Sequence, residues 1–248
     1  MSNKKIFLVI QGHTKFCDEI LESVKTIENV IWSTDDDADP SHLEKIKTSN
    51  VKLVTSKKPN FSGYGNVNLQ INSTLQGLYL AKELGANYVV KMRSDMTFSD
   101  TNKFIDILNL NNKIYFLAYV NNLKSGNLPS EIKEIDVWIS KQNLYINNLK
   151  GYNYVLDFIN YGPIEKMISF WSYPLENSNI PVPLEHKLLV WDLKNNHQDL
   201  DLSFEYLSEI YGFFLSDLQK NKINLNSLKW GYDYSTLGTG LSEGGFLS

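Results

Sequence analysis

The chain has 248 residues, of which 42% are hydrophobic and 12% aromatic, and it carries a formal net charge of −4. This length and hydrophobic content suffice to bury a large core in one domain. The acidic balance argues against nonspecific nucleic-acid binding, which needs a basic face. The only cysteine, Cys17, excludes an internal disulfide and favours a reducing compartment. The sequence shows no signal-peptide pattern and no apolar run of roughly 20 residues, so it predicts a soluble cytoplasmic protein.

The N-terminal third alternates between strand and helix patterns. Strands are predicted at 5–10, 29–32 and 51–54, with helices at 16–27 and 42–47 between them. A longer helix then begins near residue 66 and ends at Gly85, a residue that adopts the left-handed conformation of a helix end without strain. A fourth strand follows at 88–92. Regular alternation of this kind predicts an α/β fold with a mostly parallel sheet and helices on its faces.

The long helix and the strand after it form the most informative segment. The inner face of the helix repeats at spacings of three and four, through Val67, Ile71, Leu75, Leu78 and Ala81. A helix that feeds a parallel strand runs antiparallel to it, so the start of the helix and the end of the strand meet at one edge of the sheet. We therefore predict that Asn66, Gln70 and Ser73 lie near Arg93 and Asp95.

The predicted strands all end in polar residues. Gln11 and His13 follow the first strand, Ser33 and Thr34 close the second, and Arg93 closes the fourth. Ligands of open α/β sheets bind at this carboxyl edge, and amides held there suit a nucleotide base or ribose. The alternative is structural, with a helix or turn cap and a surface arginine. The chain has no GxGxxG or GxxxxGK[ST] motif, so a dinucleotide oxidoreductase or a P-loop enzyme is unsupported.

The pattern loosens after residue 100. Strands are predicted at 113–120, around 135–139 and at 152–158, and helices at 163–171, 183–191 and 204–218. The strand at 152–158 leads to Tyr161-Gly162-Pro163, where the proline suits the first turn of the helix that follows. We predict one domain over residues 1–237, with a helical C-terminal part, and a flexible tail rich in glycine and serine over 238–248.

Four motifs together resemble the WavE lipopolysaccharide-synthesis family, from the first strand to about Trp191. They are Asn66-x-Asn68-x-Gln70-Ile71, Lys91-x-Arg93-x-Asp95, Asp157…Gly162 and Pro183…Glu185. The resemblance implies a single Rossmann-like domain of the nucleotide-sugar-binding GT-A type. It also implies transfer of a sugar from a nucleotide donor to a bacterial surface glycan, which is a lipopolysaccharide, lipooligosaccharide or capsule acceptor.

The resemblance also suggests roles for the strand-end residues. Such enzymes hold a divalent cation on the diphosphate with two aspartates, and here Arg93 stands in the first place, with Asp95 alone left as a solvent-edge carboxylate. We predict Mg²⁺ or Mn²⁺ on Asp95. The open alternative is metal-independent action, with the bidentate guanidinium meeting the phosphate. Nucleotide-sugar contacts are expected from Gln11, His13, Ser33, Thr34, Asn66, Asn68, Gln70, Arg93 and Asp95.

A carboxylate is also needed as general base for the acceptor hydroxyl in an inverting enzyme. The candidates are Asp157, at the end of a predicted strand, and Glu185, in the first turn of a predicted helix. Both have a structural alternative, because Glu185 interacts favourably with a helix dipole and Asp157 can cap the segment that follows it.

Two other functional classes stay open. A sugar nucleotidyltransferase would show a glycine-rich, basic loop after the first strand, which Gln11-Gly12-His13-Thr14-Lys15 matches poorly. A noncatalytic carbohydrate-binding protein would need no nucleotide site. The partners expected of a glycosyltransferase are the nucleotide-sugar donor and a glycan or lipid-linked acceptor, with peripheral association at the inner membrane through that acceptor or another protein.

Overall fold

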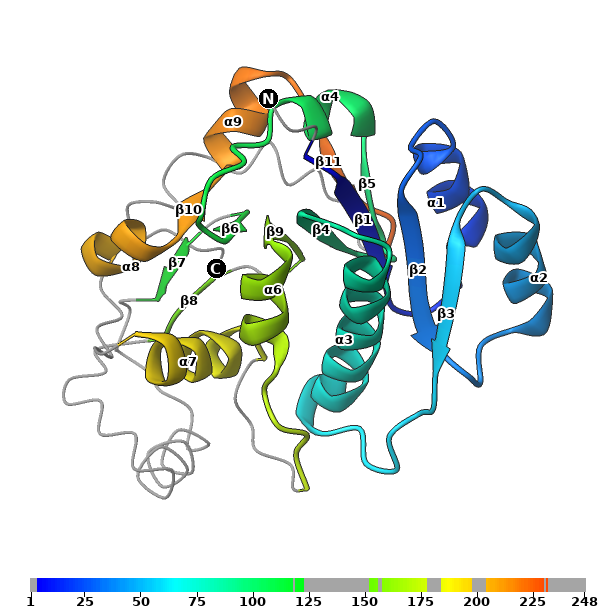
Figure 1. Ribbon diagram of the computed structural model, residues 1–248, viewed down its shortest axis with the longest axis horizontal. Helices are drawn as coiled ribbons and strands as arrows, with labels where there is room; N and C mark the ends of the chain where they lie inside the picture. The colour runs from blue at the N-terminus through cyan, green and yellow to red at the C-terminus, as the bar shows by residue number, and fades with distance from the viewer. Residues whose placement is uncertain are drawn as a thin grey trace.

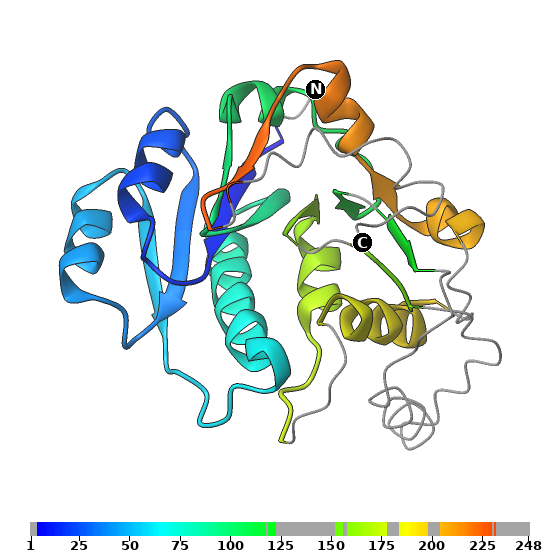
Figure 2. The same ribbon diagram turned by 180° about the vertical axis from the view of Figure 1, so that it is seen from behind.

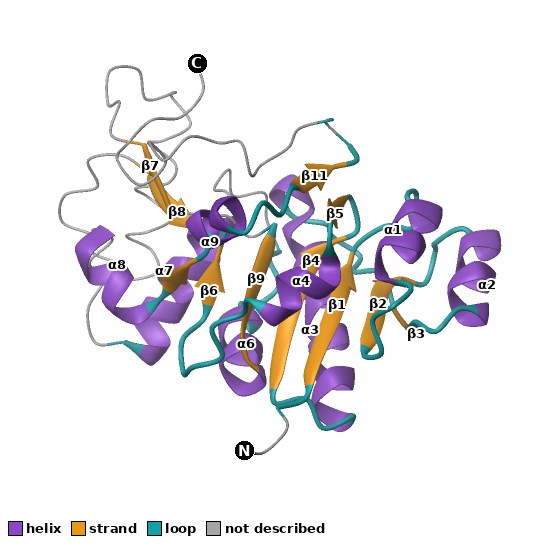
Figure 3. Cartoon of the chain, turned by 90° about the horizontal axis from the view of Figure 1, so that it is seen from above, coloured by secondary structure: helices purple, strands orange, loops and turns teal. Residues whose placement is uncertain are grey.

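A seven-stranded sheet forms the centre of the molecule (Figure 1). The computed structural model describes residues 4–117, 119–122, 152–155, 158–177, 184–197, 204–229 and 231. The strand order across the sheet is β10-β6-β9-β4-β1-β2-β3, part of which can be followed across the molecule in Figure 3. The strands are β1 (Ile6–Gln11), β2 (Val30–Asp35), β3 (Lys52–Ser56), β4 (Tyr88–Arg93), β6 (Tyr115–Phe116), β9 (Ile159–Pro163) and β10 (Gly212–Phe213).

Within this sheet only β9 runs against its neighbours. It pairs antiparallel with β4 and β6, whereas the other pairings in the sheet are parallel. Two small antiparallel pairs lie apart from it: β5 (Met96–Phe98) with β11 (Leu225–Ser227), and β7 (Tyr119–Asn122) with β8 (Tyr152–Val155). The predicted α/β class with a mostly parallel sheet is confirmed.

Helices cover both faces of the sheet. They are α1 (Cys17–Val24), α2 (Pro40–Thr48), α3 (Val67–Glu83), α4 (Thr101–Asp106), α6 (Ile164–Trp171), α7 (Leu184–Asn196), α8 (Phe204–Ile210) and α9 (Leu215–Lys220), with a short 3₁₀ turn, η1 (Tyr64–Asn66), before α3. Figures 1 and 2 show α1 and α2 beside β2 and β3, and α7 and α8 at the other end of the sheet. None of the helices within the described residues is long and apolar enough to cross a bilayer.

The strands divide their side chains between two cores because successive residues point to opposite faces. On one face, Phe7 and Val9 of β1 pack with α3, α6 and α7. On the other, Leu8 and Ile10 pack with α1, α2, α4 and α9. The neighbouring strands β1 and β2 are thus buried on both sides, which explains why their sequences are largely apolar.

Helix α3 is fixed closely against the sheet. It ends as predicted at Gly85, whose φ of 82° allows the two closing bonds from the amides of Gly85 and Ala86 to the carbonyls of Lys82 and Ala81. In its middle, Gly77 faces the strands, where a Cβ would lie 2.5 Å from Val9 Cγ1 and 3.1 Å from Ser33 Cβ. The absence of a side chain at Gly77 therefore sets how near α3 lies to β1 and β2.

The C-terminal half differs from the predictions. Pro163, predicted to open a helix, is the last residue of β9, and the helix begins after it at Ile164. The single helix predicted at 204–218 is broken into α8 and α9 by β10. The strand predicted at 113–120 splits between β6 and β7, which belong to different sheets. The strand predicted around 135–139 and the tail at 238–248 lie outside the described residues, so the domain limits stay a prediction.

Replacing Gly77 with alanine tests this close approach. Alanine in an ordinary helix position would stabilise the protein by about 0.5–1 kcal/mol relative to glycine. Here the added methyl group must displace Val9 or Ser33, so we expect Gly77→Ala to lower the free energy of unfolding by about 1–3 kcal/mol in urea titrations. Glu83→Ala, at an exposed position of the same helix, is the control and should change stability little. A stabilised Gly77→Ala protein would contradict the packing described.

Candidate functional site

A cavity of about 490 Å³ lies at the carboxyl ends of β1, β2 and β4. Its wall comes from those strand ends, from α3 and the turn before it, and from Lys229 late in the chain. Asn66 at the start of α3, and Gln70 and Ser73 within it, line the same cavity as Arg93 and Asp95. The predicted meeting of the helix start and the strand end is confirmed.

The turn into α3 is built from residues in the left-handed region. Gly65 has φ 61° and Asn66 has φ 63°, and asparagine is one of the few side chains that accept this conformation. The Gln70 side chain donates from Nε2 to the Gly65 carbonyl at 3.1 Å. These contacts hold the rim of the cavity while the amides of Asn66 and Gln70 remain part of its lining.

The first strand also ends in a special backbone position. Gly12 has φ 126°, and a Cβ there would lie 2.7 Å from Ser94 Oγ. Its amide donates to the Ser33 carbonyl at 3.1 Å, and the Ser94 amide donates to the Gln11 carbonyl at 2.9 Å. Backbone bonds thus continue past the strand ends and hold the floor of the cavity together.

Arg93 and Asp95 form a bidentate ion pair beside this floor. Arg93 Nε donates to Asp95 Oδ1 at 3.0 Å, and Nη2 donates to Oδ2 at 2.7 Å. The guanidinium carbon also lies 5.1 Å from the centre of the Phe158 ring. Asp95 is only 2% exposed, so the expectation of a solvent-edge carboxylate is wrong: the chain turns back at Ser94, and β5 begins directly after Asp95.

The same ion pair occupies the carboxylate that was predicted to bind a metal ion. Both oxygens of Asp95 already accept hydrogen bonds from Arg93, and among the described residues no three or more His, Cys, Asp or Glu side chains are grouped so as to hold a metal ion. A divalent cation on Asp95 would first have to displace the guanidinium. The arrangement therefore does not fit the predicted Mg²⁺ or Mn²⁺ site.

The charged groups among the described lining residues divide into two halves. His13, Arg93, Asp95 and Lys229 form what we call the β4 half, and Asp35, Asp37 and Lys58 form the β2 half. The charges that act on His13 are those of Asp95, Arg93, Lys229 and Lys15, whereas those that act on Asp35 are Asp37, Lys58 and Asp36. With His13 neutral, the β4 half holds two cations and one carboxylate. The β2 half holds two carboxylates and one cation.

Burial shifts the pKa of one group in each half. Burial of the imidazole lowers the pKa of His13 below 6.5; Asp95 opposes this, while Arg93 and Lys229 add to it. Burial raises the pKa of Asp35, and the carboxylates of Asp37 and Asp36 contribute in the same direction. Asp35 Oδ1 is buried and has no hydrogen-bond partner among the described residues.

Several predicted site residues lie elsewhere. Ser33 is fully buried and donates to the Ser73 carbonyl at 2.5 Å, and Thr34 is buried in the same strand. Asn68 is also buried: its Nδ2 donates to the carbonyls of Phe61 and Glu176, and its Oδ1 accepts from the Glu176 amide. These three side chains do not belong to the described lining of the cavity. Their positions give them structural roles, and their nucleotide contacts stay predictions.

The predicted bases are not placed at the cavity. Glu185 lies in the first turn of α7 and is not one of the described residues that line it. Asp157 lies outside the described residues. The catalytic role of both residues stays a prediction.

The lining residues that were not predicted include Asp37, Lys58 and Lys229. Asp37 belongs to an acidic run that resembles an ordinary exposed loop, although Lys58 pairs with it at 2.6 Å. Lys229 reaches the cavity from the turn after β11. Nothing in the local sequence of Lys58 or Lys229 distinguishes either one from other surface lysines.

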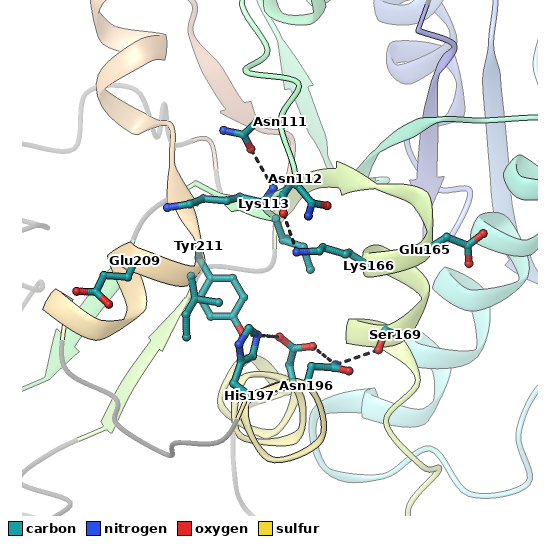
Figure 4. A pocket seen from close by; sticks show the side chains of 13 residues that line it. Asn111, Asn112, Lys113, Glu165, Lys166, Ser169, Asn196, His197, Glu209 and Tyr211 are labelled. Atoms are coloured by element: carbon teal, nitrogen blue, oxygen red, sulfur yellow. Dashed lines mark hydrogen bonds and ion pairs between the residues drawn. The ribbon is translucent and has the colours of Figure 1, made fainter.

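A second cavity, of about 660 Å³, lies at the opposite edge of the sheet, before β6 and β10 (Figure 4). Asp192 there accepts hydrogen bonds from the Tyr211 hydroxyl and, at 2.6 Å, from Asn196 Nδ2, and it lies 3.5 Å from His197 Nε2. Asn196 also donates to Ser169 Oγ at 2.9 Å. The polar side chains of this network already bond to one another. The first cavity is therefore the better candidate for a ligand site.

Comparisons with known proteins do not assign the chain to a family. No protein-family model and no curated protein matches it. Similar solved structures include a 4-diphosphocytidyl-2C-methyl-D-erythritol synthase from Anaerococcus prevotii, with 12% identity and a TM-score of 0.42, covering 83% of each chain. A glycosyltransferase involved in glycosylating the major capsid of PBCV-1 has 13% identity and a TM-score of 0.40, covering 84% of this chain and 81% of that one.

A mannose-1-phosphate geranyltransferase from Thermus thermophilus also resembles the chain, with 10% identity and a TM-score of 0.40, covering 74% of this chain and 67% of that one. At these identities and TM-scores, likeness says nothing of what the present chain binds. Its function must be judged from its own residues.

Removing the charge of Asp95 should cost stability. Asp95→Asn keeps the size of the side chain but removes the carboxylate charge that pairs with the Arg93 guanidinium, and breaking a largely buried pair in this way costs about 2–4 kcal/mol. We expect a clear fall in the melting temperature. Asp106→Asn, at an exposed position, is the control and should melt like the wild type. Equal melting of the two variants would show that the ion pair contributes nothing to the fold.

Proposed function

We propose that this chain is a glycosyltransferase of the GT-A type that uses a nucleotide-sugar donor. The observation that carries the proposal is the division of charge in the cavity at the carboxyl edge of the sheet. A nucleotide sugar has a matching division, because its diphosphate is anionic and its nucleoside carries hydroxyl and N–H donors. The diphosphate is then bound in the β4 half, and the nucleoside extends toward the β2 half.

The chemistry required of the β4 half is stabilisation of a leaving group. Transfer breaks the bond between the anomeric carbon and a phosphate oxygen, which leaves negative charge on the phosphate, and fixed positive groups lower the barrier to that step. Arg93 carries a planar guanidinium with N–H donors that suit phosphate oxygens, and its Nε and Nη2 are held by Asp95. Asp95 and the Phe158 ring orient the guanidinium, so little reorganisation is needed when the phosphate arrives.

The acceptor part of the proposal rests on the resemblance to the WavE family. In this proposal the acceptor of the sugar is a bacterial surface glycan, which is a lipopolysaccharide, a lipooligosaccharide or a capsule. The reaction takes place on the cytoplasmic side of the inner membrane. Asp157 and Glu185 remain the proposed bases for the acceptor hydroxyl.

Isothermal titration tests the donor class. The probes are UDP-glucose, GDP-mannose and CMP-sialic acid, each compared with its nucleoside triphosphate. Binding of a nucleotide sugar at least as tightly as the triphosphate supports the glycosyltransferase. Binding of a triphosphate alone would instead support a sugar nucleotidyltransferase, and binding of none of the probes would overturn both proposals.

The same titration tests whether Arg93 or a divalent cation neutralises the phosphate charge. Because Arg93 occupies both oxygens of Asp95, we expect equal affinity for the bound nucleotide sugar in EDTA and in Mn²⁺. Arg93→Lys should weaken binding about tenfold, since lysine cannot reproduce the planar fork. Binding that requires Mn²⁺ and survives Arg93→Lys would restore the metal-dependent alternative.

The affinity should also depend on pH through His13. Its pKa lies below 6.5, so the free protein gains the imidazolium charge only as the pH falls below that value. A unit charge about 4 Å from a phosphate contributes about 1 kcal/mol in water, so the affinity for UDP-glucose should rise as the pH falls from 7.5, by at most about fivefold once the imidazole is fully protonated. UDP-glucose itself does not titrate in this range, and His13→Gln should abolish the change.

The pH effect on the free protein has the opposite sign. A lowered pKa means that the unfolded chain binds the proton more tightly, so the free protein loses a little stability as the pH falls through 6.5. Melting curves with and without UDP-glucose should therefore diverge toward acidic pH. Parallel curves would show that the His13 imidazole does not face the ligand.

A further inference from the structure

Gln11 occupies a central place on the floor of the cavity. It is the last residue of β1, in register with Ser33 on β2 and Arg93 on β4, and therefore lies between the β2 and β4 halves. Although it lines the cavity, it is only 5% exposed. Its side chain is too enclosed to exchange partners freely with water, so the direction in which its amide points matters.

Ser73 of α3 fixes that direction. Gln11 Nε2 donates to Ser73 Oγ at 3.0 Å, and Ser73 Oγ donates its single proton to the Leu69 carbonyl at 2.7 Å. A carbonyl can only accept, so the hydroxyl is left to accept from Gln11. The amide must therefore turn its NH₂ group toward Ser73 and its oxygen away from it.

The oxygen of that amide has no partner among the described residues. Gln11 Oε1 is buried and makes no hydrogen bond there, and the same holds for Asp35 Oδ1 in the β2 half. Both atoms accept hydrogen bonds, and both belong to residues that line one cavity. Buried polar atoms in folded proteins are nearly always paired, so the cavity is arranged for a ligand that brings hydrogen-bond donors.

We infer that Ser73 locks Gln11 as an acceptor, so that Gln11 Oε1 receives a hydrogen bond from an N–H of the base or an O–H of the ribose of the bound nucleotide. Ser73 is then a positioning residue that touches no ligand and yet sets which nucleosides are accepted. The inference rests on the proposed function, since it names the part of the nucleotide that this part of the floor recognises.

The lock has a specific consequence for variants. Ser73→Ala removes the hydroxyl, and the Gln11 amide can then turn and present its NH₂ group, which accepts nothing. Gln11→Met keeps the length of the side chain and removes the acceptor. Both variants should lose the preference of the wild type for one base, or for ribose over deoxyribose. Gln11→Met should also weaken binding of the preferred nucleotide about tenfold, as expected for one hydrogen bond.

The matched control is Thr74→Val on the same helix. Thr74 is fully buried, its hydroxyl has no partner in the described part of the chain, and it is not one of the described lining residues. The change removes a buried hydroxyl next to Ser73 without touching Gln11. It should leave every nucleotide affinity unchanged, and thermal melting confirms that each variant is folded.

Isothermal titration with UDP, CDP, GDP, ADP and 2′-deoxy-UDP tests the inference. If Gln11 accepts from the base, the wild type prefers one base, and both variants reduce that preference about tenfold. If it accepts from the ribose, the wild type prefers UDP to 2′-deoxy-UDP, and this ratio falls instead. Either result supports the inference; the first also identifies the base of the nucleotide, and the second assigns the contact to the ribose.

Two other results would contradict either the inference or the proposed function. Wild-type protein that binds the nucleotides, together with folded Gln11→Met and Ser73→Ala variants that keep its affinities and both ratios, would overturn the inference and leave the proposed function intact. Wild-type protein that binds none of these nucleotides and no nucleotide sugar would overturn the proposed function itself.

Discussion

The cavity depends on how closely α3 approaches β1 and β2. Gly77 leaves no side chain between the helix and Val9, and Ser33 Oγ then reaches the Ser73 carbonyl at 2.5 Å. One turn earlier along the helix, this close contact places the amide of Gln70 at the strand ends. A helix set farther from the sheet would open the cavity and separate Ser73 from Gln11, so the recognition chemistry rests on a packing distance.

The start of α3 is fixed by a second and different interaction. Asn68 bonds through its side chain to both backbone groups of Glu176, whose carboxylate lies 2.6 Å from Lys187 Nζ of α7 in an almost fully buried ion pair. Burial lowers the pKa of Lys187, and Glu176 opposes the shift. Two buried charges are costly unless they remain together, so this pair joins α7 and the segment before it to the helix that carries the rim of the site.

The carboxyl edge of the sheet could be predicted because it depends on local patterns. The spacing from Val67 to Ala81 identifies α3, and the apolar strand before Arg93 identifies β4. The failures come from contacts distant in sequence. Pro163 is typical of a first helical turn, yet Gly162 and Pro163 lie in β9, where the absence of a side chain at Gly162 leaves room for Ile114, whose Cα would lie 3.1 Å from an added Cβ. The apolar period over 204–218 continues through Gly212, where the Tyr115 ring occupies the place of a side chain. The burial of Asp95 likewise depends on the chain turning back into β5.

The pairing of Arg93 with Asp95 has an evolutionary consequence. The exchange Arg93→Asp would place two carboxylates one residue apart at the end of β4, because Asp95 already stands in the second position. It would also remove the guanidinium that now occupies both oxygens of Asp95. Two neighbouring buried carboxylates repel each other unless a cation joins them, so a need for metal would arise in the same step that removes the arginine. Under the proposed function, a single codon therefore separates neutralisation of a phosphate by a guanidinium from neutralisation by a metal ion.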